Sequence, residues 1–154
     1  MKRSGLRYRD SVCAVLQRRS DGRLLVCHRK GFPPAEGWQF PQGGVDRAKG
    51  IADEMKRELR EEIGTDKVEI VSISPKSYTY RFPPDAQERR PGYIGQRQRW
   101  VLARFCGGDD EIRFEHVPAE FDAFEWVDAA EALKRIVDFK RDVYSKALGD
   151  FGLL

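Results

Sequence analysis

The amino-acid sequence predicts an α/β (α+β) fold in which a mixed sheet lies between helices. Strand-like apolar segments occur before and after one mid-chain helical segment, and a second helical stretch lies near the C-terminal end. Because a sheet with two apolar faces must bury both, this order of elements places helices on both faces. The chain has 154 residues, which matches the usual size of one domain. We therefore expect a single domain over residues 1–154.

Short apolar segments bounded by turn residues predict the strands. The predicted strands are residues 11–17, 23–28, 38–40, 68–74, 77–82, 99–106 and 124–127. Residues 20–22 (Ser-Asp-Gly) separate the first two, and such residues are typical of a hairpin turn. Residues 41–44 (Pro-Gln-Gly-Gly) are predicted as a turn. Residues 83–95 form a long polar loop, and loops of this length often carry function.

The first predicted helix covers about residues 50–63. Its apolar residues Ile51, Met55, Leu59 and Ile63 recur every four positions, which is typical of one buried helix face. Gly64 follows directly, and glycine is the common residue at a helix C-terminus.

The second predicted helix lies between Asp128 and Leu148. Asp128 and Glu131 have the spacing of an N-terminal capping box, and Gly149 is the predicted stop. The charged Lys140 interrupts the apolar stripe of this segment, which allows a break in the helix near residue 138.

Composition excludes several classes of protein. Lys and Arg number 28 against 25 Asp and Glu, giving a net charge of +3, so a strongly basic nucleic-acid-binding coat is excluded. No apolar run reaches the roughly 18 residues of a membrane helix, and the first residues lack the apolar core of a signal peptide. Cys13, Cys27 and Cys106 lack metal-ligand spacing. We expect them to be reduced, buried thiols of a cytoplasmic protein.

Three carboxylates are concentrated on the first helix. At helical spacing, Glu58, Glu61 and Glu62 form one contiguous ridge beside the buried stripe. Their repulsion costs a few tenths of a kcal/mol per pair, and their position near the helix C-terminus is unfavourable for anions. An isolated Glu-Glu pair is usually only a solvated surface. A ridge of three instead indicates a hard divalent cation, which binds carboxylate oxygens.

Residues 43–64 resemble the Nudix box, whose pattern is G-x5-E-x7-R-E-U-x-E-E-x-G-U with U a bulky aliphatic residue. The matching positions are Gly43, Arg57, Glu58, Leu59, Glu61, Glu62 and Gly64. Two positions depart from the pattern, because Lys49 replaces the first Glu and Thr65 replaces the final aliphatic residue. In the family, that first Glu is thought to help hold the box Arg. Asp53 and Glu54, four and three residues before Arg57, could hold it here instead.

Four further segments are similar to one branch of this family, the bacterial RNA pyrophosphohydrolases and the related diadenosine tetraphosphate hydrolases. They are residues 38–44, 95–100, 118–122 and 139–144. The resemblance implies a Nudix-type α/β/α sandwich and metal-dependent hydrolysis of phosphoanhydride bonds in nucleoside 5′-polyphosphates. The expected reaction is release of pyrophosphate from triphosphorylated RNA ends, and asymmetric cleavage of a dinucleoside polyphosphate is the alternative. A non-catalytic nucleotide- or RNA-binding module is a further alternative, for which Lys49 is the only indication.

The resemblance also implies roles for individual residues. The expected metal ligands are the carboxylates of Glu58, Glu61, Glu62 and Glu120 and the backbone carbonyl of Gly43. They would hold two or three Mg²⁺ (or Mn²⁺) ions, which neutralise phosphate oxygens and orient a water. Arg57 belongs to the catalytic group, and either Glu58 or Glu62 accepts the proton of that water. No membrane and no stable protein partner is expected.

The predicted substrate contacts also follow from the resemblance. They are Arg9, Lys30 and Lys140 for phosphates, Val137 and Phe139 for a base, and Tyr80 as a stacking surface. For Val137 and Phe139 the alternative is core packing, and for Tyr80 it is filling a strand face. For Arg9 and Lys30 it is plain solvation.

Two arginines of the long loop, Arg89 and Arg90, could contact an RNA backbone, although solvation is the more common outcome for such residues. With a net charge of only +3, we expect the protein to bind one or two end nucleotides rather than a long RNA tract.

Overall fold

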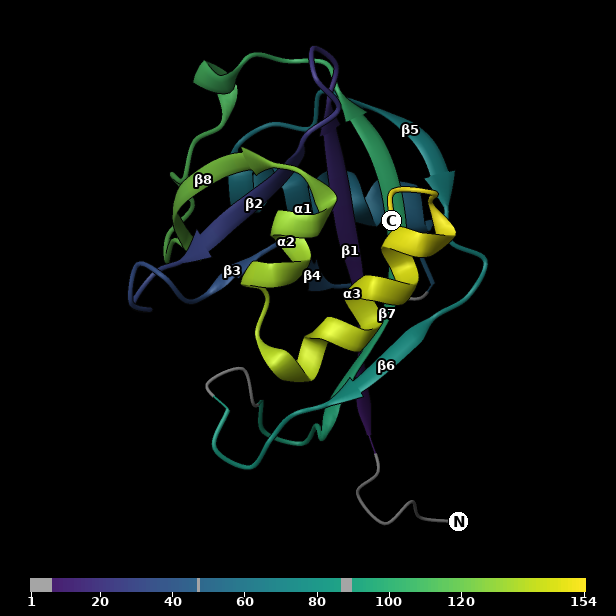
Figure 1. Ribbon diagram of the computed structural model, residues 1–154. Coiled ribbons are helices and arrows are strands. Elements are labelled where there is room, and N and C mark those ends of the chain that lie inside the picture. Colours follow the sequence, from purple (N-terminus) through teal and green to yellow (C-terminus); the bar gives the residue numbers. More distant parts are fainter. Residues whose placement is uncertain (1–6, 47, 87–89) are drawn as a thin grey trace.

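The computed structural model describes residues 7–46, 48–86 and 90–154 (Figure 1). Its strands are β1 (Tyr8–Arg18), β2 (Leu24–Arg29), β3 (Trp38–Gln39), β4 (Gln42–Gly44), β5 (Val68–Ile73), β6 (Tyr78–Arg81), β7 (Gly95–Phe105) and β8 (Phe121–Val127). Its helices are α1 (Ile51–Ile63), α2 (Ala129–Arg135) and α3 (Asp138–Asp150), with a short 3-10 turn at Asp109–Glu111.

The strands form one mixed sheet around β1 and β7. These two strands run parallel over their whole length, from Tyr8 opposite Gly95 to Arg18 opposite Phe105. The sheet order is β3-β2-β1-β7-β5, with β4 pairing β1, β6 pairing β7 and β8 pairing β2. The pairs other than β1–β7 are antiparallel. The prediction of a mixed sheet is confirmed.

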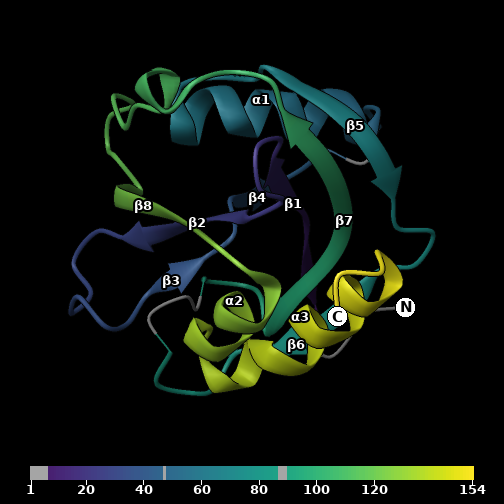
Figure 2. The same ribbon diagram turned by 45° about the horizontal axis from the view of Figure 1, so that its top comes forward.

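Alternate residues of the central strands enter two separate cores. On β1, Val12 and Ala14 pack with Met55 of α1, whereas Cys13 and Val15 lie in a second cluster with residues of α2 and α3. This alternation follows from the two-residue period of a strand. The sheet therefore lies between α1 on one face and α2 with α3 on the other (Figure 2), which confirms the predicted α/β/α layering.

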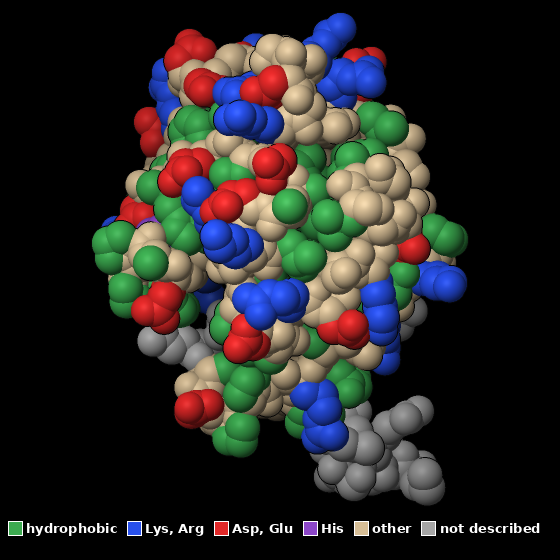
Figure 3. Space-filling model, in the orientation of Figure 1, with side chains coloured by type: hydrophobic (Ala, Val, Ile, Leu, Met, Phe, Trp, Pro, Cys, Tyr) green, Lys and Arg blue, Asp and Glu red, His purple; other side chains and the backbone are tan. Residues whose placement is uncertain are grey.

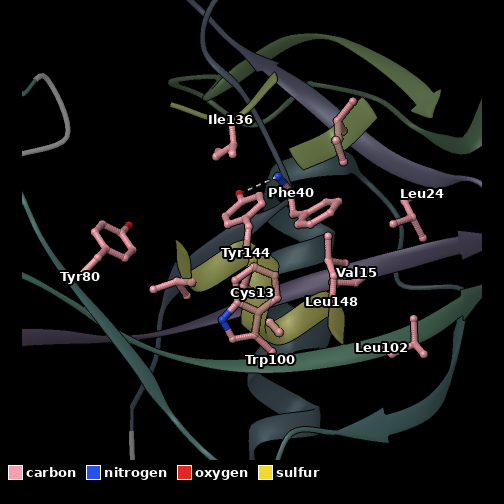
Figure 4. Close-up of a cluster of buried hydrophobic side chains, with 14 of the residues drawn as sticks. Cys13, Val15, Leu24, Phe40, Tyr80, Trp100, Leu102, Ile136, Tyr144 and Leu148 are labelled. Atoms are coloured by element: carbon pink, nitrogen blue, oxygen red, sulfur yellow. Dashed lines mark hydrogen bonds between the residues drawn. The ribbon is translucent and has the colours of Figure 1, made fainter. Parts of the chain in front are cut away.

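The second core contains three aromatic rings in mutual contact (Figure 4). Phe40 and Tyr144 are parallel with centroids 4.9 Å apart, and Trp100 meets Tyr144 edge-on at 5.0 Å. The Tyr144 hydroxyl also accepts a hydrogen bond of 3.1 Å from the backbone N–H of Phe40. Helix α3 is thereby attached to the segment that leads into β4.

The predicted turn at residues 41–44 is wrong, because residues 42–44 form strand β4. Gln42, Gly43 and Gly44 pair with Cys13, Val12 and Ser11 of β1. Glycine is a poor strand former by itself, so this strand depends on its partner β1 rather than on local preference. Strand β7 likewise begins at Gly95, four residues before the predicted start, because the whole of β1 is available for pairing.

The break in the C-terminal helical segment is confirmed and lies at Ile136 and Val137. Both residues are extended, with ψ of 146°. The Arg141 side chain bridges the break by donating hydrogen bonds to the carbonyls of Leu133 and Ile136. Half of the predicted capping box is present, since the Asp128 carboxylate accepts from the N–H of Glu131 at 2.8 Å, while the Glu131 carboxylate accepts from Arg135. The predicted stop is early, because α3 continues through Gly149 to Asp150.

Two of the three cysteines are buried as predicted. Cys13 and Cys27 are 0% exposed, but Cys106 is exposed because it follows the last residue of β7, so its predicted burial is wrong. All three are free thiols.

Within the described residues, no helix is long and apolar enough to cross a membrane. On the face that carries α2 and α3, acidic and basic side chains are interspersed (Figure 3). This agrees with the nearly balanced charge of the chain.

Candidate active site

Helix α1 positions the carboxylate ridge. Its buried residues Met55, Leu59 and Ile63 are 0% exposed against the sheet, which fixes the rotation of the helix about its axis. The helix ends at Gly64, whose φ of 77° is the left-handed conformation that glycine adopts without strain. With the apolar face held in place, Glu58 lies against Gly43 of β4, and Glu58, Glu61 and Glu62 line one cavity with that strand.

A cavity of about 270 Å³ brings the predicted metal ligands together, and we call it the carboxylate cavity. It is lined by Arg9, Gln42, Gly43, Gly44, Glu58, Glu61, Glu62, Arg90, His116, Pro118 and Glu120. All five predicted metal-ligating residues are in this set, together with Arg9 from the predicted phosphate contacts. Residues from β1, β4, α1 and the segment before β8 therefore converge on one space.

The two glycines of β4 allow this convergence. A Cβ at residue 43 would overlap the carboxylate of Glu58, and a Cβ at residue 44 would overlap the guanidinium of Arg9. With Glu58 and Arg9 in these positions, the strand that passes between them has no room for side chains at residues 43 and 44. The pairing of Gly43 with Val12 of β1 holds the strand at this depth.

Glu120 is held at the cavity by the end of strand β2. Its backbone carbonyl accepts a hydrogen bond of 3.0 Å from the N–H of Lys30, and Arg29 Nη2 lies 3.9 Å from its carboxylate. Glu120 precedes β8, whose pairing with β2 has a register shift between His28 and Arg29. The position of the Glu120 carboxylate thus depends on the pairing of β2 with β8 rather than on α1.

Arg57 is the hub of hydrogen bonding on α1. Its Nη2 donates to the carbonyl of Gly44 and to Glu58 Oε1, both at 3.0 Å. Its Nη1 donates to Glu61 Oε1 at 3.2 Å, and its Nε donates to Glu54 Oε2 at 3.2 Å. The guanidinium of Arg57 therefore links the carboxylates of α1 to strand β4.

The electrostatics of Glu62 indicate a missing positive charge. Burial, followed by the charges of Glu120 and Glu58, raises the pKa of its carboxyl well above the ordinary value. Its Oε2 is buried and has no hydrogen-bond partner among the described residues. An orphaned buried carboxylate oxygen costs free energy unless a cation or donor satisfies it.

The donor set fits hard divalent cations, which take carboxylate and carbonyl oxygens. In the described part of the chain, no three acidic, His or Cys side chains are already gathered into a ligand group, because Arg57 holds Glu58 and Glu61. The Glu61 side chain is 41% exposed and has room to turn toward an ion. Glu62 already faces the cavity.

Arg9 contributes a cation to the same space. The pKa of its guanidinium is lowered from the ordinary value. Burial is the largest cause and the nearby Arg90 the next, and together they outweigh the opposing charges of Glu58 and Glu120. An arginine stays protonated under all ordinary conditions. A charged donor therefore lines the same cavity as the carboxylates, where it can bind a phosphate.

Comparison with known proteins places this geometry in a family. The family model described as NUDIX domain matches residues 7–147. The chain belongs to the Nudix family. A curated RNA pyrophosphohydrolase of Gluconacetobacter diazotrophicus is 41% identical over 155 residues, covering 95% of this chain and 92% of the relative. One of Acidiphilium cryptum is 41% identical over 152 residues, covering 96% and 92%.

Solved structures agree with the fold. The Escherichia coli dihydroneopterin triphosphate pyrophosphohydrolase matches with a TM-score of 0.66 at 18% identity, covering 90% of this chain and 95% of that one. A Caenorhabditis elegans Ap4A hydrolase binary complex matches with a TM-score of 0.63 at 18% identity, covering 94% and 98%. The predicted Nudix-type fold is confirmed.

Three predicted substrate residues lie at a second cavity of about 570 Å³ beside the helix break, which we call the α2–α3 cavity. Val137, Phe139 and Lys140 line it together with Trp38 and Gln39. Val137 is 44% exposed, so it is not a core residue. Lys140 is 1% exposed, and its Nζ donates to Gln39 Oε1 at 3.3 Å.

Two other predicted substrate residues lie elsewhere. Tyr80 is 6% exposed and packs against Phe82 and Phe139 with centroids 6.0 and 5.7 Å apart. This position favours the alternative in which Tyr80 fills a strand face. The exposed Lys30 reaches Glu120 only through its backbone N–H, and its side chain is not among those lining the carboxylate cavity.

Sequence reasoning misses four residues that line the carboxylate cavity and undervalues a fifth. The four are Gln42, Gly44, His116 and Pro118, and the fifth is Arg90, for which solvation is the more common outcome. His116 and Arg90 belong to irregular segments, where no periodicity indicates the direction of a side chain. The neighbouring Arg89 lies outside the described residues.

Proposed function

We propose that this chain is a Mg²⁺- or Mn²⁺-dependent Nudix hydrolase that releases pyrophosphate from the triphosphorylated 5′ end of RNA. The buried Glu62 Oε2, which has no hydrogen-bond partner in the described part of the chain, lies at the carboxylate cavity and carries the metal-dependent part of the proposal. Relatives 41% identical over 95–96% of the chain, both RNA pyrophosphohydrolases, support the choice of substrate. We also propose a single domain that acts in the cytoplasm, which its three free thiols favour.

The carboxylates of Glu58, Glu61, Glu62 and Glu120 and the carbonyl of Gly43 would hold two or three ions. When bound, such ions neutralise phosphate oxygens and lower the pKa of a coordinated water. Arg9 and Arg90, which line the same cavity, bind phosphate oxygens. The carboxylate of Glu58 or Glu62 accepts the proton of the attacking water. Arg57 keeps Glu58 in place through its 3.0 Å hydrogen bond.

The α2–α3 cavity is the proposed site of the terminal nucleoside. Trp38, Val137 and Phe139 offer apolar surface to a base, and Lys140 places a cation within the wall. Aromatic surfaces stack on bases with little preference for sequence. Gln39 lines this cavity and Gln42 lines the carboxylate cavity, so the short segment between them connects the two spaces.

Product analysis tests the proposal. The protein is incubated with Mg²⁺ and either triphosphorylated RNA or diadenosine tetraphosphate, and Glu62→Gln serves as the matched control. We expect pyrophosphate and monophosphorylated RNA, with little ATP from the dinucleotide. Predominant formation of ATP and AMP would favour the dinucleoside polyphosphate hydrolase instead. Ligand binding without turnover by the unaltered protein would identify a non-catalytic module.

A further inference from the structure

We propose that Glu54 is the positioning residue for Arg57 in this chain and replaces the carboxylate that the Nudix box places at residue 49. The inference rests on the proposed function. It assigns to Glu54 the orientation of the metal-binding side of α1, a role that the box pattern does not give to this position. Lys49, which occupies the box position, cannot accept a hydrogen bond from Arg57.

The contact between Glu54 and Arg57 involves both carboxylate oxygens. Arg57 Nε donates to Glu54 Oε2 and Arg57 Nη2 donates to Glu54 Oε1, each at 3.2 Å. Such two-point pairing fixes the plane of a guanidinium as well as its distance. Glu54 is only 3% exposed, so the carboxylate side of the pair is shielded from water, while the Arg57 side chain is 36% exposed. Asp53 is the other residue that the sequence offers as a partner for Arg57. The hydrogen bonds of the Arg57 guanidinium instead go to Glu54, Glu58, Glu61 and Gly44.

Glu54 also holds the connection between β4 and α1. Its Oε1 accepts a hydrogen bond of 2.8 Å from the backbone N–H of Asp46. The N–H of Lys49 closes the same turn by donating to the carbonyl of Asp46 at 3.0 Å. A single carboxylate therefore joins the turn that follows β4 to the guanidinium on α1.

The consequences reach the proposed metal ligands through Arg57. With its Nε edge held by Glu54, the guanidinium directs Nη2 toward both the Gly44 carbonyl and Glu58 Oε1. These contacts fix Glu58 against the backbone of Gly43. Glu54 itself does not line the carboxylate cavity. It therefore acts on the ligands through Arg57 and the glycine strand.

Lys49 and Glu54 are neighbours across a smaller cavity of about 190 Å³, which both side chains line. A glutamate at residue 49 would place a second negative charge beside Glu54, whereas the lysine present there complements it. The identities of residues 49 and 54 are therefore coupled. Moving the carboxylate back to residue 49 requires its removal from residue 54.

The test compares Glu54→Gln, Glu54→Ala, Lys49→Glu and the double variant Lys49→Glu/Glu54→Ala. Asp53→Asn is the matched control, because it removes an adjacent carboxylate of α1 that is exposed. Three quantities are measured: the Mn²⁺ dissociation constant by electron paramagnetic resonance, and kcat and KM for triphosphorylated RNA. Circular dichroism and thermal melting show which variants are folded.

We expect both Glu54 variants to weaken Mn²⁺ binding by about 10–100-fold, as loss of a group supporting metal ligands does. The value of kcat falls by a similar factor and KM changes less, while Asp53→Asn resembles the unaltered protein. Lys49→Glu/Glu54→Ala recovers most of the Mn²⁺ affinity and kcat, although Lys49→Glu alone brings no gain. This rescue separates positioning from a merely structural role.

Unchanged Mn²⁺ affinity in the isosteric Glu54→Gln variant would overturn the inference. So would a folded double variant that binds Mn²⁺ no better than Glu54→Ala. If the unaltered protein hydrolyses neither RNA nor dinucleotide, the proposed function fails, but the Mn²⁺ series still decides the role of Glu54.

Discussion

The backbone of Gly43 lies directly against the carboxylate of Glu58, so that a Cβ at residue 43 would overlap the carboxylate carbon and both of its oxygens. Strand pairing with Val12 prevents the glycine from moving away. Arg57 holds the carboxylate from the other side at 3.0 Å. The Gly43 backbone and the Glu58 carboxylate, which are predicted to share a metal, are therefore held in contact.

Gly43→Ala is expected to displace Glu58 and lower kcat for triphosphorylated RNA by at least about 100-fold, since small displacements of catalytic groups have effects of this size. The matched control is Gly149→Ala, because a Cβ at residue 149 meets nothing within 4 Å. That control lies in α3 and should keep full activity with unchanged or slightly raised stability. Equal kcat in the two variants would contradict the close approach.

Glu62→Gln is expected to have opposite effects on stability and activity. Removing a buried charge that is repelled by Glu120 and Glu58 should raise the melting temperature in EDTA. Loss of a candidate proton acceptor should lower kcat by about 10²–10⁴-fold. Added Mg²⁺ should raise the melting temperature of the unaltered protein more than that of the variant. If Glu62→Gln melted at a lower temperature in EDTA than the unaltered protein, repulsion of Glu62 by Glu58 and Glu120 would not be destabilising the fold.

The buried His28 predicts a pH dependence of stability. Burial lowers the pKa of its imidazole, but hydrogen bonding to the Asp122 carboxylate at 2.6 Å and to the Pro33 carbonyl outweighs burial and raises it. A raised pKa in the folded state stabilises the protein fully below the unfolded value of about 6.5. This contribution is lost as the pH rises through the folded pKa.

Denaturant titrations of the unaltered protein and His28→Gln at pH 5.5 and pH 9 measure this effect. The difference in unfolding free energy between the two should be larger at pH 5.5, by about 1 kcal/mol or less, because Asp122 is partly exposed. A difference that does not depend on pH would contradict the pairing.

The cysteines should differ in reactivity. Burial raises the pKa of the Cys13 and Cys27 thiols well above the ordinary value, so neither supplies a thiolate in the folded protein. A thiol reagent such as DTNB should modify one thiol, the exposed Cys106, in the native state and three after unfolding. Cys106→Ser should leave no reactive thiol in the native protein. Modification of more than one native thiol would contradict the packing of the two cores.

The part of the site that lies on α1 could be predicted because its signals are local. A four-residue apolar period fixes which side of the helix is buried, and Glu58, Glu61 and Glu62 then follow from helical geometry alone. Glu120 was predicted only from the resemblance of its Pro-Ala-Glu-Phe-Asp segment, because its position depends on pairing between β2 and β8.

The features that were missed depend on distant partners. Residues 41–44 contain turn-forming residue types, and their strand exists only because β1 offers an edge at Ser11–Cys13. His116 and Arg90 enter the carboxylate cavity from irregular segments. The choice of Glu54 over Asp53 as partner for Arg57 was open in the sequence, since both have suitable helical spacing. In the structure, Glu54 is buried and accepts the hydrogen bonds of Arg57.

The pairing of β4 with β1 has a consequence for substrate recognition. Because β1 is also hydrogen-bonded to β7 along its full length, the glycine strand shares the rigidity of the sheet centre. Strand β4 becomes ordered when the protein folds rather than when RNA binds. RNA binding therefore involves little loss of backbone entropy in β4. The amide hydrogens of this short strand should consequently exchange with deuterated solvent as slowly as those of the central strands β1 and β7.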